Sequence, residues 1–263
     1  MNQSASLYNS IGSSYNNTRQ ADPYIVGKLI DLLCPQSNGH YLDVGCGTGN
    51  YTIAISEKGF QFTGLDPSGA MLSHARLKSS SIQWIKGTAE QIPLPDATFH
   101  GALATLTIHH WQSLQNGFTE ISRVLKEKGR LVIFTATPEQ MQGYWLNHYF
   151  PQILKEAIAK MPSSKEIQSV ALRAGFQIVK QEKYFIRPDL KDSFLYVGKH
   201  NPEFYFRDAI RQGISSFASN QNKVEVEQGL CRLQHDIKTK EFESVQKRFD
   251  NNMGDYLFIC AQK

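Results

Sequence analysis

Short apolar runs alternate with amphipathic stretches along the first half of the chain. Apolar residues recur at helical spacing after Asp22 and Pro23, a capping residue and a first-turn proline, and again over residues 113–125. The apolar runs between these stretches predict strands over residues 40–44, 61–65, 82–86, 99–106 and 130–135. Short strands joined by single helices are typical of a parallel sheet with right-handed crossovers.

The second half of the chain has a different pattern. Ser163 and Glu166 have the spacing of a capping box before an amphipathic helix that Gly175 ends, and residues 176–180 predict another strand. Residues 187–254 are typical of helices joined by polar linkers, and an apolar strand follows them.

We therefore predict an α/β protein with a Rossmann-like, doubly wound and mostly parallel sheet of seven strands. Residues 1–186 and 255–263 form the core in this interpretation. Residues 187–254 form a helical insertion before the last strand, which we interpret as a substrate lid.

A glycine-rich loop follows the first predicted strand. Gly45, Gly47 and Gly49 lie between that strand and a helix, a geometry that brings the backbone close to a nucleotide-like ligand. Enzymes that bind dinucleotides use the pattern GxGxxG, whereas the third glycine here comes one residue too early. Asp43 precedes the loop, and its carboxylate would repel a pyrophosphate but suits a cationic ligand. The loop therefore opposes a nicotinamide-dependent oxidoreductase.

Asp66 stands at the end of the second predicted strand, about 20 residues after Gly45. A carboxylate at this place can accept hydrogen bonds from two ribose hydroxyls. The alternative explanation is a tight glycine turn in an unrelated α/β protein, without a ligand.

Several ordered runs together resemble a known family. LDVGCGTGNYT (42–52), GLDPSGAMLSHAR (64–76) and WIKGTAEQIPLPDATFHGALATLTIHHW (84–111) resemble motifs I to IV of class I S-adenosylmethionine-dependent methyltransferases. The resemblance is to the broad group that includes ubiquinone/menaquinone and biotin-pathway methyltransferases, and it covers roughly residues 8–136. It implies a methyltransferase with S-adenosylmethionine as cofactor, whereas the C-terminal half carries no substrate-defining motif.

The resemblance also implies which residues bind the cofactor. Gly45, Gly47 and Gly49 would line its methionine part, Asp66 would hold the ribose, and Met71 would pack on the adenine.

Two further groups of residues complete the implied cofactor site. Thr88, Ala89 and Glu90 would meet the adenine edge, and Thr105 and Leu106 would lie beside the sulfonium. The family usually has Asp where Thr88 stands, so we expect a weaker hydrogen bond to the adenine amino group there.

Tyr15 and Arg19 lie in a segment that resembles the YDxxR sequence of the family. The resemblance implies that Arg19 pairs with the cofactor carboxylate, a suitable task for a guanidinium, and that Tyr15 covers the active site. The alternative is a frayed, solvated N-terminus.

His109 and His110 follow the fourth predicted strand and are candidates for a general base. The alternative is that one of them only caps or packs against the next helix. Methyl transfer needs little covalent help because the sulfonium is already activated, so the lack of an obvious catalytic residue is compatible with an enzyme.

Composition limits the remaining possibilities. Hydrophobic residues make up 41% and charged residues 20%, which is typical of a globular protein, and a formal net charge of +4 predicts no strong nucleic-acid surface. The cysteines are scattered without metal-ligand spacing, and neither a signal peptide nor a membrane span is evident. We therefore expect a cytoplasmic protein without a metal site, and the sequence gives no oligomeric state.

Small-molecule methyl transfer is the function that the sequence favours most. A tRNA or protein methyltransferase of the same fold is the alternative, and it would need a basic face for which the sequence gives little support. The stretch Ala104 to Thr107 lacks the polar-Pro-Pro-aromatic sequence of enzymes that methylate base amines and amides, so that chemistry is disfavoured.

Overall fold

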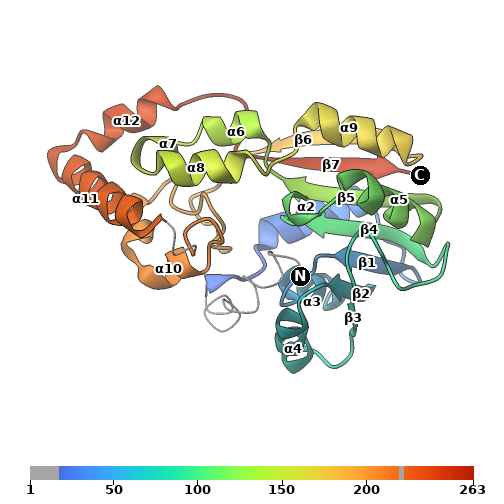
Figure 1. The fold of residues 1–263 in the computed structure, drawn as a ribbon. Helices are drawn as coiled ribbons and strands as arrows, with labels where there is room; N and C mark the ends of the chain where they lie inside the picture. Colours follow the sequence, from blue (N-terminus) through green and yellow to red (C-terminus); the bar gives the residue numbers. More distant parts are fainter. Residues whose placement is uncertain (1–17, 219–221) are drawn as a thin grey trace.

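The computed structural model describes residues 18–218 and 222–263. Its strands are β1 (His40–Val44), β2 (Gln61–Asp66), β3 (Gln83–Lys86), β4 (Phe99–Thr105), β5 (Leu125–Thr135), β6 (Gln177–Tyr184) and β7 (Tyr256–Gln262). They form one sheet in the order β3-β2-β1-β4-β5-β7-β6 (Figure 1). The strands β1 to β5 are parallel, and β7 runs antiparallel to both β5 and β6. The predicted Rossmann-like, mostly parallel seven-stranded sheet is confirmed.

Helices cover both faces of this sheet. One face packs against α2 (Pro23–Leu33) and α3 (Asn50–Ser56), and the other packs against α5 (Leu114–Val124) and α9 (Ser164–Arg173). Along β5, Val132 and Phe134 face the first of these layers, whereas Leu131 and Ile133 face the second. This alternation of two apolar sets is the reason why the central strands are apolar on both faces, as expected for a sheet that is covered on both sides.

Two strands differ from their predicted limits by more than one residue. The strand β5 begins at Leu125, which pairs with Phe99, and a bulge then separates this pair from the pairing of Gly101 with Arg130. The residues of this irregular stretch are polar, which explains why the sequence predicts the strand only from residue 130. The strand β6 continues to Tyr184, beyond the predicted limit at residue 180, and its polar sequence reflects its exposed position at the edge of the sheet.

The segment after β5 contains helices that the sequence analysis did not predict. They are α6 (Pro138–Gln142), α7 (Leu146–Tyr149) and α8 (Pro151–Ile158). Thr137 and Gln140 form a reciprocal capping box that starts α6. The aromatic residues Tyr144, Trp145, Tyr149 and Phe150 of this segment are each at most 1% exposed, so they belong to the core.

The insertion between β6 and β7 contains η2 (Pro202–Phe206), α10 (Asp208–Gln212), α11 (Lys223–Thr239) and α12 (Phe242–Arg248). These elements gather beyond one end of the sheet, beside α7 and α8 (Figure 1). Tyr196 of the insertion stacks on Tyr144 with ring centroids 3.8 Å apart, and Phe242 meets Trp145 edge-on at 5.0 Å. The aromatic core therefore joins the insertion to the segment after β5.

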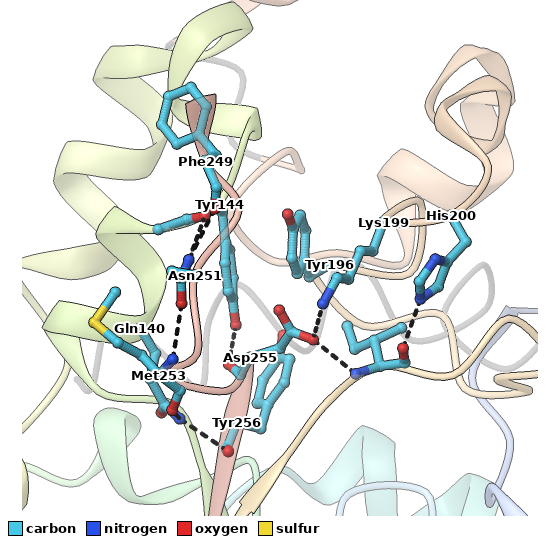
Figure 2. Close-up of polar contacts among 12 residues, drawn as sticks. Gln140, Tyr144, Tyr196, Lys199, His200, Phe249, Asn251, Met253, Asp255 and Tyr256 are labelled. Carbon is cyan, nitrogen blue, oxygen red and sulfur yellow. Dashed lines mark hydrogen bonds and ion pairs between the residues drawn. The ribbon is translucent and has the colours of Figure 1, made fainter. Parts of the chain in front are cut away.

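A polar cluster fastens both ends of the insertion to the sheet (Figure 2). The Asp255 carboxylate, just before β7, accepts hydrogen bonds from the backbone N–H of Ile186 at 2.7 Å and from Nζ of Lys199 at 2.6 Å. The hydroxyl of Tyr144 donates to the backbone carbonyl of Asp255, and Nε2 of His200 lies 2.6 Å from the carbonyl oxygen of Ile186. One carboxylate thus joins the end of β6, the insertion and the start of β7.

The Asp255 cluster leads to a prediction about stability. Asp255→Ala should lower the free energy of unfolding by about 2–4 kcal/mol, because it leaves the Lys199 ammonium and the Ile186 N–H without their buried acceptor. Urea denaturation followed by circular dichroism measures this loss. Asp250→Ala, at an exposed position after α12, is the matched control. Equal effects of the two substitutions would contradict an anchoring role for Asp255.

Candidate functional site

A cavity lies at the carboxyl ends of the parallel strands. Its wall is built by the glycine loop after β1, the end of β2, the start of α4 (Gly69–Lys78), residues 87–90 after β3 and residues 105–107 after β4. Ligands of open α/β sheets bind at this edge, beside the point where the strand order reverses. Here that point lies between β1 and β4.

Most of the residues predicted to bind the cofactor line this cavity. They are Arg19, Gly45, Gly47, Asp66, Met71, Thr88, Ala89, Glu90, Thr105 and Leu106. Asp43 and Gly49 are not part of its wall, and Tyr15 lies outside the described residues. His110 lines the cavity and His109 does not.

The glycine loop wraps closely around neighbouring backbone. Gly45 has φ +74°, and a Cβ atom there would lie 2.0 Å from Oγ1 of Thr107, so no side chain fits. The N–H groups of Gly45 and Cys46 both donate to the carbonyl of Leu65 in β2, at 2.8 and 3.0 Å. A Cβ atom on Gly47 would meet nothing within 4 Å, which leaves room for a ligand against the loop.

Gly49 lies against an aromatic ring of the sheet. A Cβ atom on Gly49 would lie 2.4 Å from the ring of Trp84, a residue of β3. The third glycine therefore allows close packing between the start of α3 and the indole, away from the cavity.

Asp66 presents a buried and rigidly held carboxylate at the cavity wall. Its Oδ1 accepts from the N–H of Ser68 at 2.8 Å, and its Oδ2 accepts from the N–H of Gly47 at 2.9 Å. Burial raises the pKa of Asp66, and these two backbone donors oppose the shift. Each carboxylate oxygen can accept a second hydrogen bond, so a vicinal diol could bind both oxygens.

Asp43 is almost fully buried, with an exposed fraction of 2%. Its Oδ2 accepts from the hydroxyl of Thr52 at 2.6 Å, and its Oδ1 has no hydrogen-bond partner among the described residues. Burial raises the pKa of Asp43 to about 6, and the nearby charge of Asp66 adds to the rise. An unpartnered buried acceptor close to a second carboxylate fits a site that receives a cationic ligand.

The wall after β3 contains residues that were predicted to contact the cofactor. One of them, Glu90, also has a structural role. Met71 is buried near the start of α4, and Thr88 and Ala89 line the cavity. The carboxylate of Glu90, however, accepts from the N–H groups of Gln112 and Ser113 at 2.6 and 3.3 Å. Glu90 therefore also fixes the loop before α5, a role that the sequence analysis did not predict.

Leu106 turns the chain away from β4 in a strained conformation. Its φ of +53° lies in the left-handed region, and its N–H donates to the carbonyl of Phe134 at 2.7 Å. Such a conformation is uncommon for a residue with a side chain and tends to occur at functional sites. This turn brings residues 105–107 to the cavity wall.

The two candidate histidines are close to each other but differ in their surroundings. Their ring centroids are 3.9 Å apart, and Nδ1 of His109 has no hydrogen-bond partner within the described part of the chain. Burial, with a contribution from the charge of Lys160, lowers the pKa of His110 to about 4, and burial also lowers the pKa of His109 well below its usual range. Both imidazoles are therefore neutral at neutral pH.

Arg19 has a partner that the sequence did not reveal. Its guanidinium pairs with the carboxylate of Asp192, which comes from the insertion and also lines the cavity. The hydroxyl of Tyr51, another residue of the wall, donates to the same carboxylate at 3.0 Å. Asp192 lies in a polar linker without a motif, so no local pattern could have identified it.

Two kinds of feature are absent from the described residues. In residues 18–218 and 222–263, His, Cys, Asp and Glu side chains form no group of three or more that could hold a metal ion. No helix in the same ranges is long and apolar enough to cross a bilayer.

Comparison with known proteins gives a family match. A model of a methyltransferase domain matches residues 42–133, which include the glycine loop, Asp66 and the wall after β4. A crystal structure from Anabaena variabilis, described as a methyltransferase from an antibiotic biosynthesis pathway, superimposes with a TM-score of 0.82 and 30% sequence identity. The match covers 92% of this chain and 98% of that protein.

Curated relatives match over shorter stretches. An uncharacterized methyltransferase from Mycobacterium tuberculosis is 31% identical over 135 residues, 51% of this chain and 55% of the relative, so the chain spans about half the length of that relative. A demethylmenaquinone methyltransferase from Chlorobaculum tepidum is 28% identical over 176 residues, 59% of this chain and 71% of the relative.

The buried carboxyl of Asp43 leads to a pH-dependent prediction. Burial raises its pKa from 3.8 to about 6, so its effect on the free energy of unfolding is most favourable below pH 4 and becomes unfavourable as the pH rises through 6. Asp43→Asn keeps an acceptor for Thr52 and removes the charge. We expect it to stabilise the protein by roughly 1–3 kcal/mol at pH 7.5.

Urea denaturation without ligand at pH 4.5 and 7.5 measures this difference. The stabilising effect of Asp43→Asn should be small at pH 4.5 and grow at pH 7.5. Asp31→Asn, on the exposed side of α2, is the matched control and should have no such pH dependence. A substitution that destabilises equally at both pH values would contradict the assignment of a buried, unfavourable charge to Asp43.

Proposed function

The chain belongs to the class I S-adenosylmethionine-dependent methyltransferases, and on this basis we propose that it transfers the methyl group of S-adenosylmethionine to a small-molecule acceptor. The carboxylate of Asp66 is the observation that carries the proposal. It is held at the cavity wall by two backbone donors, beside a glycine loop that leaves room for a ligand. A ribose diol is the chemical group that this arrangement fits best.

The other wall residues fit the remaining parts of the cofactor. Met71 supplies an apolar surface for the adenine, and Gly47 leaves space for the methionine part. Arg19 supplies a guanidinium for the carboxylate of the amino-acid part. Asp43, which is buried and not part of the wall, contributes negative charge that suits the positive sulfonium, and the early third glycine opposes a dinucleotide.

Bound S-adenosylmethionine supplies a methyl group that is already activated by the positive charge of its sulfur. The protein then has to align the acceptor and exclude water, which accounts for a large part of the acceleration in such reactions. Thr105 and Leu106 form the wall at the end of β4, where the strained turn fixes their position. His110 lines the cavity, but the burial that lowers its pKa to about 4 makes it a weak base, and His109 does not line the cavity.

A small acceptor is supported by the cover over the cavity. The insertion contributes Asp192 to the wall and packs through its aromatic core against the segment after β5, so we assign residues 187–254 as the lid. The names of relatives point in the same direction, since they include demethylmenaquinone and malonyl-acyl-carrier-protein methyltransferases. Incubation with radiolabelled S-adenosylmethionine and either metabolite extract or a mixture of tRNA and protein tests the acceptor class. Label transfer only to macromolecules would overturn a small acceptor.

Cofactor binding gives the most direct test of the proposal. S-Adenosylhomocysteine should bind with micromolar affinity, about −8 kcal/mol, and NADH should not bind. Asp66→Ala should weaken binding of S-adenosylhomocysteine by about 1.5–3 kcal/mol, because two charge-assisted hydrogen bonds to the ribose are lost. Isothermal titration calorimetry measures both quantities.

Asp96→Ala is the control for Asp66→Ala, since Asp96 pairs with Arg123 at an exposed position outside the cavity wall. Its affinity for S-adenosylhomocysteine should equal that of the parent chain. Tighter binding of NADH than of S-adenosylhomocysteine would refute the proposed cofactor, and parent-like binding by Asp66→Ala would remove Asp66 from the site.

A further inference from the structure

The ion pair between Arg19 and Asp192 lies at the cavity wall and connects two distant parts of the chain. Nε of Arg19 lies 2.5 Å from Oδ1 of Asp192, and Nη2 lies 3.1 Å from Oδ2, so the contact is bidentate. The hydroxyl of Tyr51 in α3 donates to the same Oδ2 at 3.0 Å. The side chains of Arg19 and Asp192 are only 13% and 1% exposed.

Backbone contacts on both sides hold this ion pair in place. The N–H of Ser193 donates to the carbonyl of Thr18 at 3.3 Å, and Nε2 of Gln20 donates to the carbonyl of Lys191 at 3.0 Å. The N–H of Lys191 donates to the carboxylate of Asp22 at 3.0 Å. Residues 18–22 and 191–193 are therefore joined along their length, and the start of the insertion is fixed to the segment before α2.

A bidentate contact determines how a guanidinium is oriented. Asp192 binds the edge of the Arg19 guanidinium that carries Nε and Nη2, and this fixes the plane of the group. Without Asp192, a mostly buried cation would lose its carboxylate partner and its orientation, at a substantial cost. Tyr51, in the helix α3 that follows the glycine loop, in turn restrains the carboxylate of Asp192.

We propose that Asp192 is a positioning residue of the cofactor site, which acts through Arg19. By this proposal the insertion supplies the carboxylate that orients Arg19 toward the carboxylate of the cofactor's amino-acid part. The inference rests on the proposed use of S-adenosylmethionine. Because the same ion pair fixes the insertion, cofactor binding and docking of the insertion strengthen each other, as linkage requires.

Two ligands that differ in the amino-acid part test this proposal. S-Adenosylhomocysteine carries the carboxylate, whereas 5′-methylthioadenosine has the adenine, ribose and thioether without it. Asp192→Asn should weaken binding of S-adenosylhomocysteine about tenfold, the loss of one charge-assisted contact, and change binding of 5′-methylthioadenosine less than about twofold. Asp189→Asn, whose partner Arg187 is exposed on the same insertion, is the matched control and should change neither affinity.

A double-mutant cycle separates positioning from general damage. If Asp192 acts through Arg19, the variant with both Arg19→Gln and Asp192→Asn should bind S-adenosylhomocysteine as Arg19→Gln alone does. Additive losses, or an equal loss of affinity for both ligands in Asp192→Asn, would overturn the proposal. Tyr51→Phe, which removes the hydroxyl donor to Asp192 together with the contact of that hydroxyl with the backbone of Asp22, provides a milder variant and should weaken binding of S-adenosylhomocysteine alone, about two- to threefold.

The parent chain distinguishes this proposal from the one on which it rests. Binding of neither ligand by the parent chain would refute the use of S-adenosylmethionine. Normal binding by the parent chain together with unchanged affinity in Asp192→Asn and Tyr51→Phe would refute only the role of Asp192.

Discussion

The direction of β7 constrains where the insertion must lie. Because β6 is antiparallel to β7 and β7 is antiparallel to β5, β6 runs parallel to β1 through β5. Its carboxyl end therefore meets the edge of the sheet where the cavity lies, and β7 starts from the same edge. The segment between these two strands therefore begins and ends at the edge of the sheet where the cavity lies. The Asp255 cluster fixes both points (Figure 2), and Asp192 of the insertion lines the cavity wall.

The cavity concentrates buried charge that the fold alone would not favour. Asp43 and Asp66 lie close enough for the charge of one to raise the pKa of the other, and Asp43 has an oxygen without a partner among the described residues. Leu106 adds a strained backbone at the same edge of the sheet. These buried carboxylates and this strained backbone lower the stability of the fold. They lie together where a positively charged ligand would offset the loss, as is common at functional sites. Elsewhere in the described core, apolar residues dominate.

The parts of the structure that depend on local sequence could be predicted. Strands β1 to β4, the glycine loop and Asp66 follow from alternating apolar runs and from glycine spacing, and the structure brings the predicted loop and Asp66 together. The bulge in β5 could not be predicted, because its residues are polar, and β6 is polar because it is an edge strand. Helices α6 to α8 are short, and the aromatic residues Tyr144, Trp145 and Phe150 that connect them pack against the insertion.

The same limit applies to the site. Residues that local patterns identify could be predicted, whereas roles that depend on contacts between distant segments could not. Asp192 meets Arg19 across 173 residues, and no periodicity or motif marks such a pair. Gly49 has the expected conformational freedom, yet only the position of Trp84 in the sheet shows that this freedom serves packing. Contacts between distant segments decide these roles, whereas sequence patterns report mainly on neighbours along the chain.

The difference between local sequence patterns and contacts between distant segments explains why the cofactor can be inferred more readily than the acceptor. The matched methyltransferase domain, residues 42–133, supplies the glycine loop, Asp66 and the wall after β4, all at the fixed edge of the sheet. Arg19 and Asp192 close the cavity from outside that stretch, on a segment before α2 and on the insertion. A site of this kind binds a common cofactor with shared rigid parts and selects its acceptor with variable ones. Specificity for the acceptor therefore has to be sought in the insertion and in its contacts with residues 18–22, where the Arg19–Asp192 pair links the two halves of the site.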